Sequence, residues 1–412
     1  MFLGVQRKRV LRAGLGVAVI GLAAWAAPAS AANYKVLHSF TGVGDGQEPF
    51  DTLVADSAGR LYGTTFEGGA QGGGTAFRLT KTGKKWTEEV LFNFSGGVQG
   101  GVVIGPSGEI YGTTKFGGTL SSGTVWRLDP NGSTWALTTL HEFNPSAGDG
   151  YYPTAGLVFG KDGLLYGTTM GQQPQDGQQS QQNPMYGTVF SISPQGDATE
   201  YAQLHVFGGT NDGQFPGLGR LTVDKKGVLT GTTQLGGTLS DGTAFQLTPP
   251  KKHQTAWSET VLHNFGGFTD AVGPFTGLAR GLDGTFYGCA TWGKNGLGAV
   301  YSLSGTSEKL LYSFGDQAND PSAAAICAVT IDATGTIYGT ANSGGANGKG
   351  ALFKVSPPES GQTAWTETVL HSFGTGDGQT PSSAPLKRGR MLYGTAGHGG
   401  ANGDGAVYVL KQ

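Results

Sequence analysis

The chain has 412 residues with a formal net charge of −2, and charged side chains make up 14% of it, below the ~25% of an average soluble protein. This composition gives no basis for a nucleic-acid partner or an anionic membrane surface. Glycine accounts for 75 residues, which would suit a disordered chain, but regularly placed aromatic residues argue for a folded one.

The N-terminal segment predicts export. Basic residues within positions 7–12 are followed by an apolar stretch at 13–27 and by the small residues Ala29-Ser30-Ala31. This order is typical of a secretory signal peptide, so we expect residues 1–31 to be removed and residues 32–412 to fold. No cysteine lies near the cleavage site and no apolar segment ends the chain. We therefore expect a secreted or periplasmic monomer without stable membrane insertion.

The remainder of the chain is a tandem repeat of seven copies. Each copy carries the triplet Tyr-Gly-Thr or a close variant, at spacings of 49 to 64 residues. The triplets begin at Tyr62, Tyr111, Tyr166, Thr230, Tyr287, Tyr338 and Tyr393. A period of this length indicates a solenoid, a propeller or an array.

The sixth copy shows the predicted strands most clearly. Four apolar runs lie at 326–332, 336–341, 350–356 and 364–373, separated by turn residues. Short alternating runs rich in Val, Thr, Tyr and Phe, bounded by Gly, Asn and Asp, are typical of β-strands. Four antiparallel strands in each of seven copies predict an all-β protein, a seven-bladed β-propeller.

Large aromatic residues recur once per copy in two phases. The third strand holds Phe77, Trp126, Phe190, Phe245, Tyr301, Phe353 and Tyr408. The fourth ends in Phe40, Phe94, Phe143, Phe207, Phe265, Phe314 and Phe373. Rings at a constant phase of a repeat predict a core between neighbouring blades.

The phase of the repeat also predicts how the ring closes. The folded part opens with a fourth-type strand at 34–40 and ends with a third-type strand at 405–410. Pairing these two strands would complete the last blade and remove two exposed strand edges.

Two cysteines are present, Cys289 in a second strand and Cys327 in an innermost strand. An even number in an exported chain permits one disulfide, and two buried thiols are the alternative.

The combination of short motifs resembles a known family. The chain reads LYGTTFEGG at 61–69, GTVF at 187–190 and LHSF at 370–373. This combination resembles the GloVer tandem repeat of bacterial exported proteins, and the resemblance covers residues 34–412. It implies an exported repeat protein. Members have variable C-terminal anchors, which this chain lacks in sequence, and the family brings no established activity to individual residues.

The long loops of the predicted propeller lie on one face. Loops that join strands two and three, and those that join strand four to the next blade, emerge together, and they are rich in glycine. Binding residues usually lie on such loops. The loops between blades also carry acids: Asp45, Asp149, Asp212, Asp270, Asp316, Asp320 and Asp377. These acids suggest either calcium ligands or ordinary turn residues, and turn chemistry is the reading we prefer.

One position near the Gly-Gly pair of the second-to-third loop varies from copy to copy. It holds Glu67, Phe116, Leu235, Trp292, Ser343 and His398. A structural position should repeat its residue type, so we expect this one to face solvent or ligand. Trp292, Phe116 and His398, with Lys115 and the amides of Gln172 and Gln173 in a long third-copy loop, are the predicted ligand contacts.

Three functions remain open from the sequence. The first is an exported binding or scaffold module for a glycan or another protein, acting through the glycine-rich face. The second is a carbohydrate-active lyase or hydrolase at the axial mouth of that face, with His398, Glu67 and Asp377 as candidate catalytic residues. The third is a structural cell-surface component. No histidine pair has zinc-ligand spacing, so we expect no metal and no cofactor.

Overall fold

The computed structural model describes residues 33–171, 186–196, 201–209, 211–267, 270–317 and 320–412. The predicted signal peptide, residues 1–31, and Gln172 and Gln173 lie outside these ranges. Within them, no helix is long and apolar enough to span a membrane. Apart from one short 3-10 turn, Pro145–Ala147, the described elements are strands.

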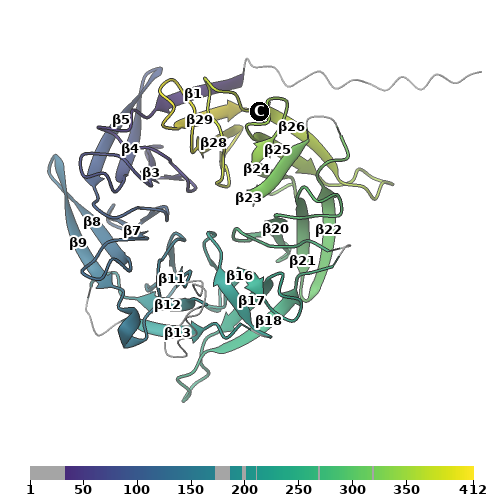
Figure 1. The fold of residues 1–412 in the computed structure, drawn as a ribbon, viewed down its shortest axis with the longest axis horizontal. Helices are drawn as coiled ribbons and strands as arrows, with labels where there is room; N and C mark the ends of the chain where they lie inside the picture. Colours follow the sequence, from purple (N-terminus) through teal and green to yellow (C-terminus); the bar gives the residue numbers. More distant parts are fainter. Residues whose placement is uncertain (1–32, 172–185, 197–200, 210, 268–269, 318–319) are drawn as a thin grey trace, which may run out of the picture.

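Seven sheets form a closed ring around a central axis, so the predicted seven-bladed propeller is confirmed (Figure 1). From the axis outward, blade one contains β2 (Val54–Ala55), β3 (Leu61–Thr65), β4 (Thr75–Thr82) and β5 (Lys85–Asn93). Blade two contains β6 (Val103–Ile104), β7 (Ile110–Thr114), β8 (Thr124–Asn131) and β9 (Thr134–Glu142). Blade three contains β10 (Val158–Phe159), β11 (Leu165–Thr169), β12 (Thr188–Ile192) and β13 (Ala202–Val206).

The remaining blades repeat this order. Blade four contains β14 (Gly213–Pro216), β15 (Thr222–Val223), β16 (Leu229–Gly236), β17 (Thr243–Thr248) and β18 (Ser258–Asn264). Blade five contains β19 (Ala279–Arg280), β20 (Phe286–Ala290), β21 (Ala299–Ser304) and β22 (Ser307–Ser313). Blade six contains β23 (Pro321–Ile331), β24 (Ile337–Gly344), β25 (Ala351–Ser356) and β26 (Thr366–Ser372). Blade seven contains β27 (Leu386–Arg388), β28 (Met391–Ala396), β29 (Ala406–Lys411) and β1 (Tyr34–Ser39).

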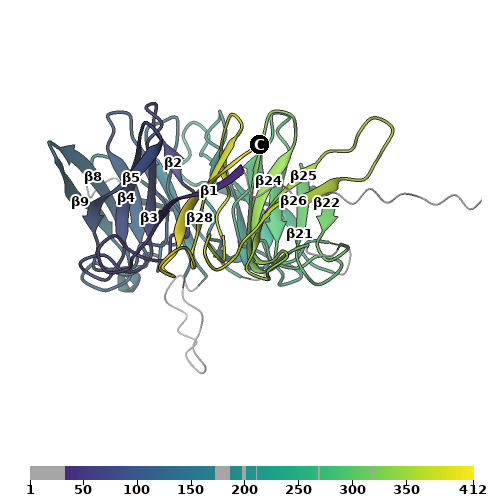
Figure 2. The ribbon, with the colours of Figure 1, turned by 90° about the horizontal axis from the view of Figure 1, so that it is seen from above.

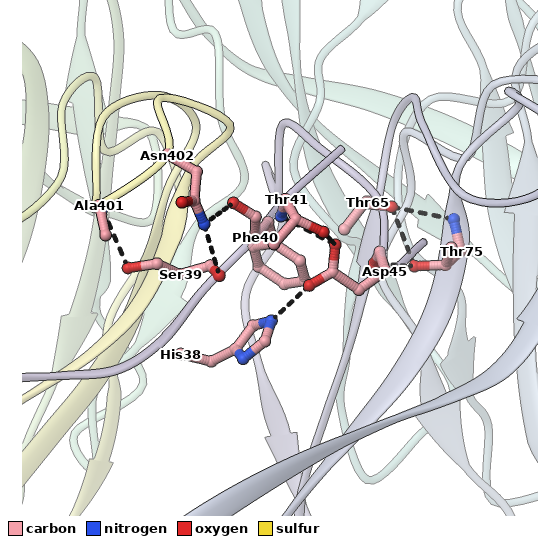
Figure 3. Close-up of polar contacts among 9 residues, drawn as sticks. All are labelled: His38, Ser39, Phe40, Thr41, Asp45, Thr65, Thr75, Ala401 and Asn402. Carbon is pink, nitrogen blue, oxygen red and sulfur yellow. Dashed lines mark hydrogen bonds and ion pairs between the residues drawn. The ribbon is translucent and has the colours of Figure 1, made fainter. Parts of the chain in front are cut away.

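The pairing of β1 with β29 closes the ring, as the phase of the repeat predicts. The two strands are antiparallel, with Tyr34 opposite Leu410 and Ser39 opposite Ala406. The adjoining loop strengthens this seam: the Asn402 side chain donates to the Phe40 carbonyl over 3.0 Å, and the Ala401 amide donates to Ser39 Oγ over 3.2 Å (Figure 3). Strand β29 and the loop before it therefore hold β1 in place.

The glycine of the Tyr-Gly-Thr triplet is required by the ring on the neighbouring strand. Gly63 lies opposite Phe77, and a Cβ added to Gly63 would come 2.6 Å from Phe77 Cζ. The same pairing places Gly112 against Trp126, at 2.4 Å. A larger residue in this strand would push the ring out of the core.

In four blades, the threonine of the triplet connects one blade to the next. Thr64 Oγ1 donates to the Gly100 carbonyl over 3.2 Å, and Thr340 Oγ1 donates to the Ser383 carbonyl over 2.8 Å. Blade five has Cys289 in this position, and the structure joins it to Cys327 of blade six in a disulfide with a Cα–Cα distance of 5.6 Å. That distance lies within the range of unstrained bridges. A covalent bond thus replaces the hydrogen bond at this junction.

The core between blades consists of aromatic pairs, as predicted, and six of the seven pairs meet edge to face. In each junction the phenylalanine ending one outer strand packs against the third-strand ring of the next blade, at centroid distances of 4.8 to 5.4 Å. All fourteen rings are buried. The pairs are Phe40–Phe77, Phe94–Trp126, Phe143–Phe190, Phe207–Phe245, Phe265–Tyr301, Phe314–Phe353 and Phe373–Tyr408.

The strand predicted at 326–332 begins earlier than expected, at Pro321 in β23. The reason is that the loop entering blade six pairs with β24 before the innermost strand starts, with Pro321 opposite Gly344. The same contact forms a separate short strand, β14, in blade four, where Gly213 lies opposite Gly236. These extensions bring two kinds of loop together on one face.

Candidate functional site

The second-to-third loop of each blade pairs with the loop that enters the same blade from the preceding one. Gln47 exchanges backbone hydrogen bonds with Glu67, and Val272 does so with Trp292. Gln379 pairs with His398 in the same way. The strands run across the thickness of the ring, so its loops lie at two opposite faces (Figure 2). The pairing places the two predicted loop types on one of them, which we call the glycine-rich face.

Four loops on this face hold a residue in the left-handed backbone region directly before a proline. These residues are Glu48, Tyr152, Phe215 and Thr380, with φ between 51° and 58°. Residues other than glycine rarely adopt this region, and a following proline restricts the backbone further. Hydrogen bonds hold the conformation: the Tyr152 amide donates to the Ser122 carbonyl, and the Tyr152 carbonyl accepts from Met170. The recurrent turn brings the side chain of its left-handed residue against the neighbouring second-to-third loop.

Five rings form an aromatic arc along part of this face. They are His398, Phe50, Phe66, Phe116 and Tyr152, and successive centroids lie 6.4, 6.1, 6.5 and 5.4 Å apart. The arc begins on blade seven and passes over blades one and two to the loop that enters blade three. It is a row of ring contacts with a histidine at one end and a tyrosine at the other.

Lys115 lies over the middle of the aromatic arc. Its Nζ is 5.3 Å from the centre of the Phe116 ring and 5.9 Å from that of Phe66. Burial lowers the pKa of this lysine, because removal from water disfavours the charged form. At the end of the arc, His398 Nδ1 is 3.7 Å from Glu48 Oε1, and burial raises the pKa of Glu48.

An axial cavity of about 240 Å³ lies beside the arc, and Phe50 belongs to both. Its walls are the residues at the start of the innermost strands, where the chain enters each blade from the glycine-rich face. They include Asp51, Gln99, Thr154, Arg220 and Ser382. The cavity lies at the axial mouth of this face, where the sequence suggested a site.

An arginine and an aspartate face each other in this cavity. The Asp51 carboxylate accepts hydrogen bonds from the Thr52 and Gly101 amides, and its Oδ2 is 3.7 Å from Arg220 Nη2. The guanidinium lies against two glycines: a Cβ on Gly101 or Gly156 would come 2.6 or 2.4 Å from its nitrogens. Arginine is accommodated here because blades two and three have no side chain at these positions.

The predicted ligand contacts are divided between this site and other places. The structure gathers Lys115, Phe116 and His398 in the aromatic arc. Trp292 lies on blade five with a side chain 53% exposed, and no ring contact joins it to the arc within the described residues. Sequence reasoning missed Asp51 and Arg220, because each occurs in a single copy of the repeat and belongs to no motif.

Each of the three catalytic candidates from the sequence has a polar partner outside that set. Asp377 Oδ2 accepts from His371 Nε2 over 2.8 Å, and its Oδ1 accepts from the Gly374 amide over 2.6 Å. Glu67 accepts instead from the Gln47 side chain over 3.0 Å. Each of these carboxylates is thus engaged by a residue other than His398, whose ion-pair partner is Glu48. A joint catalytic role of Glu67, Asp377 and His398 stays a prediction from the sequence, and the Asp377 side chain contacts the outer strand of its blade through His371.

The loop aspartates pair with the outer-strand histidines, a connection that sequence reasoning also missed. Five copies have this pair at Nε2–Oδ2 distances of 2.8 to 3.2 Å: His38–Asp45, His141–Asp149, His205–Asp212, His263–Asp270 and His371–Asp377. Figure 3 shows the first of them. The sixth blade junction uses Tyr312 with Asp320, at 3.2 Å. The sequence does contain a signal of this pairing. Phe92 replaces the histidine in the one copy whose following loop has no aspartate.

The next blade contributes a third group to each of these pairs. Tyr201 stacks on His141 and Tyr34 stacks on His371, at centroid distances of 3.9 and 3.7 Å. Four other junctions have a glutamate in this place. Burial, followed by the charge of a nearby aspartate, raises the pKa of Glu88 to about 7 and that of Glu367 to about 8. The same causes raise the pKa of Glu308.

The pKa values of three junction aspartates, Asp149, Asp212 and Asp270, shift in the opposite direction. Burial opposes ionisation of Asp149, but hydrogen bonds from His141 and the Asn144 amide hold its pKa below the ordinary value. In one junction the ligand atoms of His205, Asp212 and Glu259 lie within 4.8 Å of one another, a grouping that a metal ion can use. His205 and Asp212 are 3.2 Å apart there, a hydrogen-bonding distance that matches the other junctions.

These features define a class: a tandem-repeat β-propeller of seven blades with an aromatic mouth and an axial cavity whose lining includes one arginine and one aspartate. The chain belongs to the Gloeobacter/Verrucomicrobia repeat family, whose sequence profile matches residues 24–178, 99–293 and 283–412. No curated protein matches it in sequence.

Several solved structures are similar to the chain, and the first of them supports the fold. One, assigned as a 6-phosphogluconolactonase of Bacteroides uniformis, has 15% identity and a TM-score of 0.53, over 82% of this chain and 88% of its own. A second, assigned as a glucose dehydrogenase-type oxidoreductase of Thermus thermophilus, has 15% identity and a TM-score of 0.42, over 92% and 99%. The NanB sialidase of Streptococcus pneumoniae has 12% identity and a TM-score of 0.44, over 92% and 70%.

Proposed function

We propose that this protein is an exported binding module whose ligand, a glycan, docks on the aromatic arc and extends into the axial cavity. In this proposal the signal peptide at residues 1–31 directs the chain out of the cytoplasm. The observation that carries the proposal is the contact of the arc with the cavity through Phe50, which lines both.

The chemistry of the two parts suits a sugar chain. Aromatic faces provide flat apolar surfaces on which a sugar ring stacks, and Phe116 of the arc is 38% exposed. In the cavity, Gln99 Oε1 and Thr154 Oγ1 are buried without a hydrogen-bond partner among the described residues. Buried polar atoms normally have partners, so these two are suited to meet the hydroxyl groups of a ligand.

Binding is favoured over hydrolysis by the carboxylates. Most glycoside hydrolases use two carboxylates on opposite sides of the scissile bond. Asp51 is the one carboxylate among the described residues that line the cavity, and two backbone amides and an arginine already surround it. The lactonase-like neighbour supports the fold alone, because its identity to this chain is 15%.

A glycan array with the mature protein, residues 32–412, tests the proposal. We expect hits whose affinity falls at least tenfold in Phe116→Ala, because stacking on an aromatic side chain is lost. The matched control is Leu282→Ala, which removes an 88% exposed apolar side chain from a turn between the first two strands, on the other face. Trp292→Ala tests whether the ligand reaches blade five.

Each outcome discriminates among the alternatives. Hits that Phe116→Ala and Leu282→Ala affect equally would place the ligand away from the arc and contradict the proposal. Release of new reducing ends from a bound glycan would show the carbohydrate-active enzyme. An array without hits, combined with retention of the protein on the cell surface, would favour the structural component.

A further inference from the structure

The axial cavity contains one fixed positive charge. Among the described residues that line it, Arg220 is the single cation and Asp51 the single carboxylate. Arg220 follows Gly219 at the start of the innermost strand of blade four, where other blades have small residues. The equivalent residues are Thr52, Gly101, Gly156, Gly277, Ala328 and Ala384. The repeat therefore keeps this ring of positions small except for one long side chain.

The guanidinium of Arg220 is poorly satisfied. Its Nε and Nη2 are buried and have no hydrogen-bond acceptor among the described residues. The nearest carboxylate oxygen, Asp51 Oδ2, is 3.7 Å from Nη2, which is too long for a hydrogen bond. A guanidinium carries five N–H donors, and leaving buried donors of a charged group unpaired is costly. Such an exception in a cavity calls for an acceptor from outside the chain.

The surroundings favour an acceptor with one negative charge. The side chain of Arg220 is 24% exposed, so part of its charge faces the cavity. Asp51, held in place by two backbone amides, would repel a dianion such as phosphate more strongly than a monoanion. A carboxylate also matches the planar geometry of a guanidinium.

We propose that the axial cavity binds the carboxylate of an acidic sugar, with Arg220 as its counter-ion. The inference rests on the proposed glycan-binding function and names its ligand class. Thr154 and Gln99, whose polar atoms are unpartnered in the same cavity, meet the hydroxyl groups of the same sugar unit. The aromatic arc stacks on the neutral part of the chain that remains outside.

Calorimetric titration of the mature protein with matched probes tests this inference. The probes are trigalacturonate, its fully methyl-esterified form, sialyllactose and lactose. Trigalacturonate and its methyl ester differ in whether the uronic acid carboxylate is free or esterified. Sialyllactose and lactose differ in the presence of a sialic acid. We expect at least one acid to bind tenfold or more tightly than its neutral partner, with weaker binding at high salt because the contact is ionic.

Arg220→Gln should abolish the preference for the acid, and Arg220→Lys should retain it in reduced form, because lysine keeps the charge but loses the planar fork. Arg280→Gln is the control: it removes an exposed arginine from β19 of the next blade. Melting curves establish that each variant folds. If Arg220→Gln does not fold, the Arg220→Lys titration and the salt dependence of the parent decide.

The failures are distinguishable. The acid and its ester could bind equally well, with both weakened by Phe116→Ala. That result would overturn the carboxylate site and leave the glycan-binding function intact. An acid preference that survives Arg220→Gln would also overturn it. If neither acidic nor neutral sugars bind in a manner that depends on Phe116, the proposed function fails, and this inference fails with it.

Discussion

The junctions between blades and the axial mouth are built from the same repeat, yet they differ in regularity. Each junction uses a buried aromatic pair, and six of seven use an aspartate that accepts from a histidine or a tyrosine. The mouth is uneven: the aromatic arc covers one side of the ring, and blade four alone places an arginine in the cavity. Repeated residues maintain the ring, whereas residues found in one copy supply the candidate site.

Opening the ring should have the largest effect on stability, because it removes the strand that completes blade seven. Deleting Tyr34–Ser39 removes β1 and exposes the edge of β29 and the ring of Tyr408, so we expect the largest fall in melting temperature and concentration-dependent aggregation. Calorimetry of the deletion beside the parent measures it. A variant that melts like the parent would mean that β1 is not part of the closed structure.

The junction between blades five and six tests how far a disulfide can stand in for the repeated hydrogen bond. Losing a disulfide between residues 38 apart is expected to cost roughly 3–4 kcal/mol in the free energy of unfolding. Cys289→Thr with Cys327→Ala restores the residue that the other blades use, so we expect it to lose less stability than Cys289→Ala with Cys327→Ala. Denaturant titrations measure both differences.

Alkylation gives an independent check of the same bond. The unreduced, denatured protein should show no free thiol, and the reduced protein should show two. Labelling of two thiols without reductant would contradict the disulfide.

The glutamates in the junctions should make stability depend on pH. A carboxyl whose pKa is raised on folding keeps a proton that the unfolded chain has lost, so stability falls as pH rises from the unfolded value, ~4.3, through the folded one. For Glu88 and Glu367, whose pKa values are raised to about 7 and about 8, the loss extends across pH 5 to 8.

The aspartates set the acid limit. The lowered pKa values of Asp149, Asp212 and Asp270 give stability that is present above ~3.9 and is lost as pH falls through the folded value. We therefore expect the highest melting temperature near pH 5, and a decline toward pH 8 that is smaller than the effects above.

Paired substitutions sharpen this test. Glu88→Gln with Glu367→Gln should flatten the decline between pH 5 and 8, because the amides do not titrate. Glu359→Gln, a change in an exposed glutamate of the loop between β25 and β26, should leave it in place. An equally steep decline in both variants would show that other groups cause it.

Much of the fold follows from the sequence because its evidence is local and repeated seven times. The alternating runs predicted four strands per blade, the constant phase of the rings predicted the core, and the strand types at 34–40 and 405–410 predicted the closure. Boundaries were less certain: β23 begins at Pro321, since pairing with the neighbouring loop extends it. For the cysteines, the sequence allowed either a disulfide or two thiols.

The candidate site depended on contacts across blades, which no single repeat contains. Phe116 and His398 were recognisable as variable loop residues, but their place in one arc follows from the curvature of the ring. The sequence offered Asp377 as a candidate site residue, and the structure shows that its carboxylate contacts His371. Arg220 and Asp51 are far apart in sequence and belong to no motif, so their meeting in the cavity is decided by ring closure. By itself, the sequence determined the repeating unit and its phase; the tertiary structure decided which single-copy side chains meet, because that depends on the packing of seven blades around one axis.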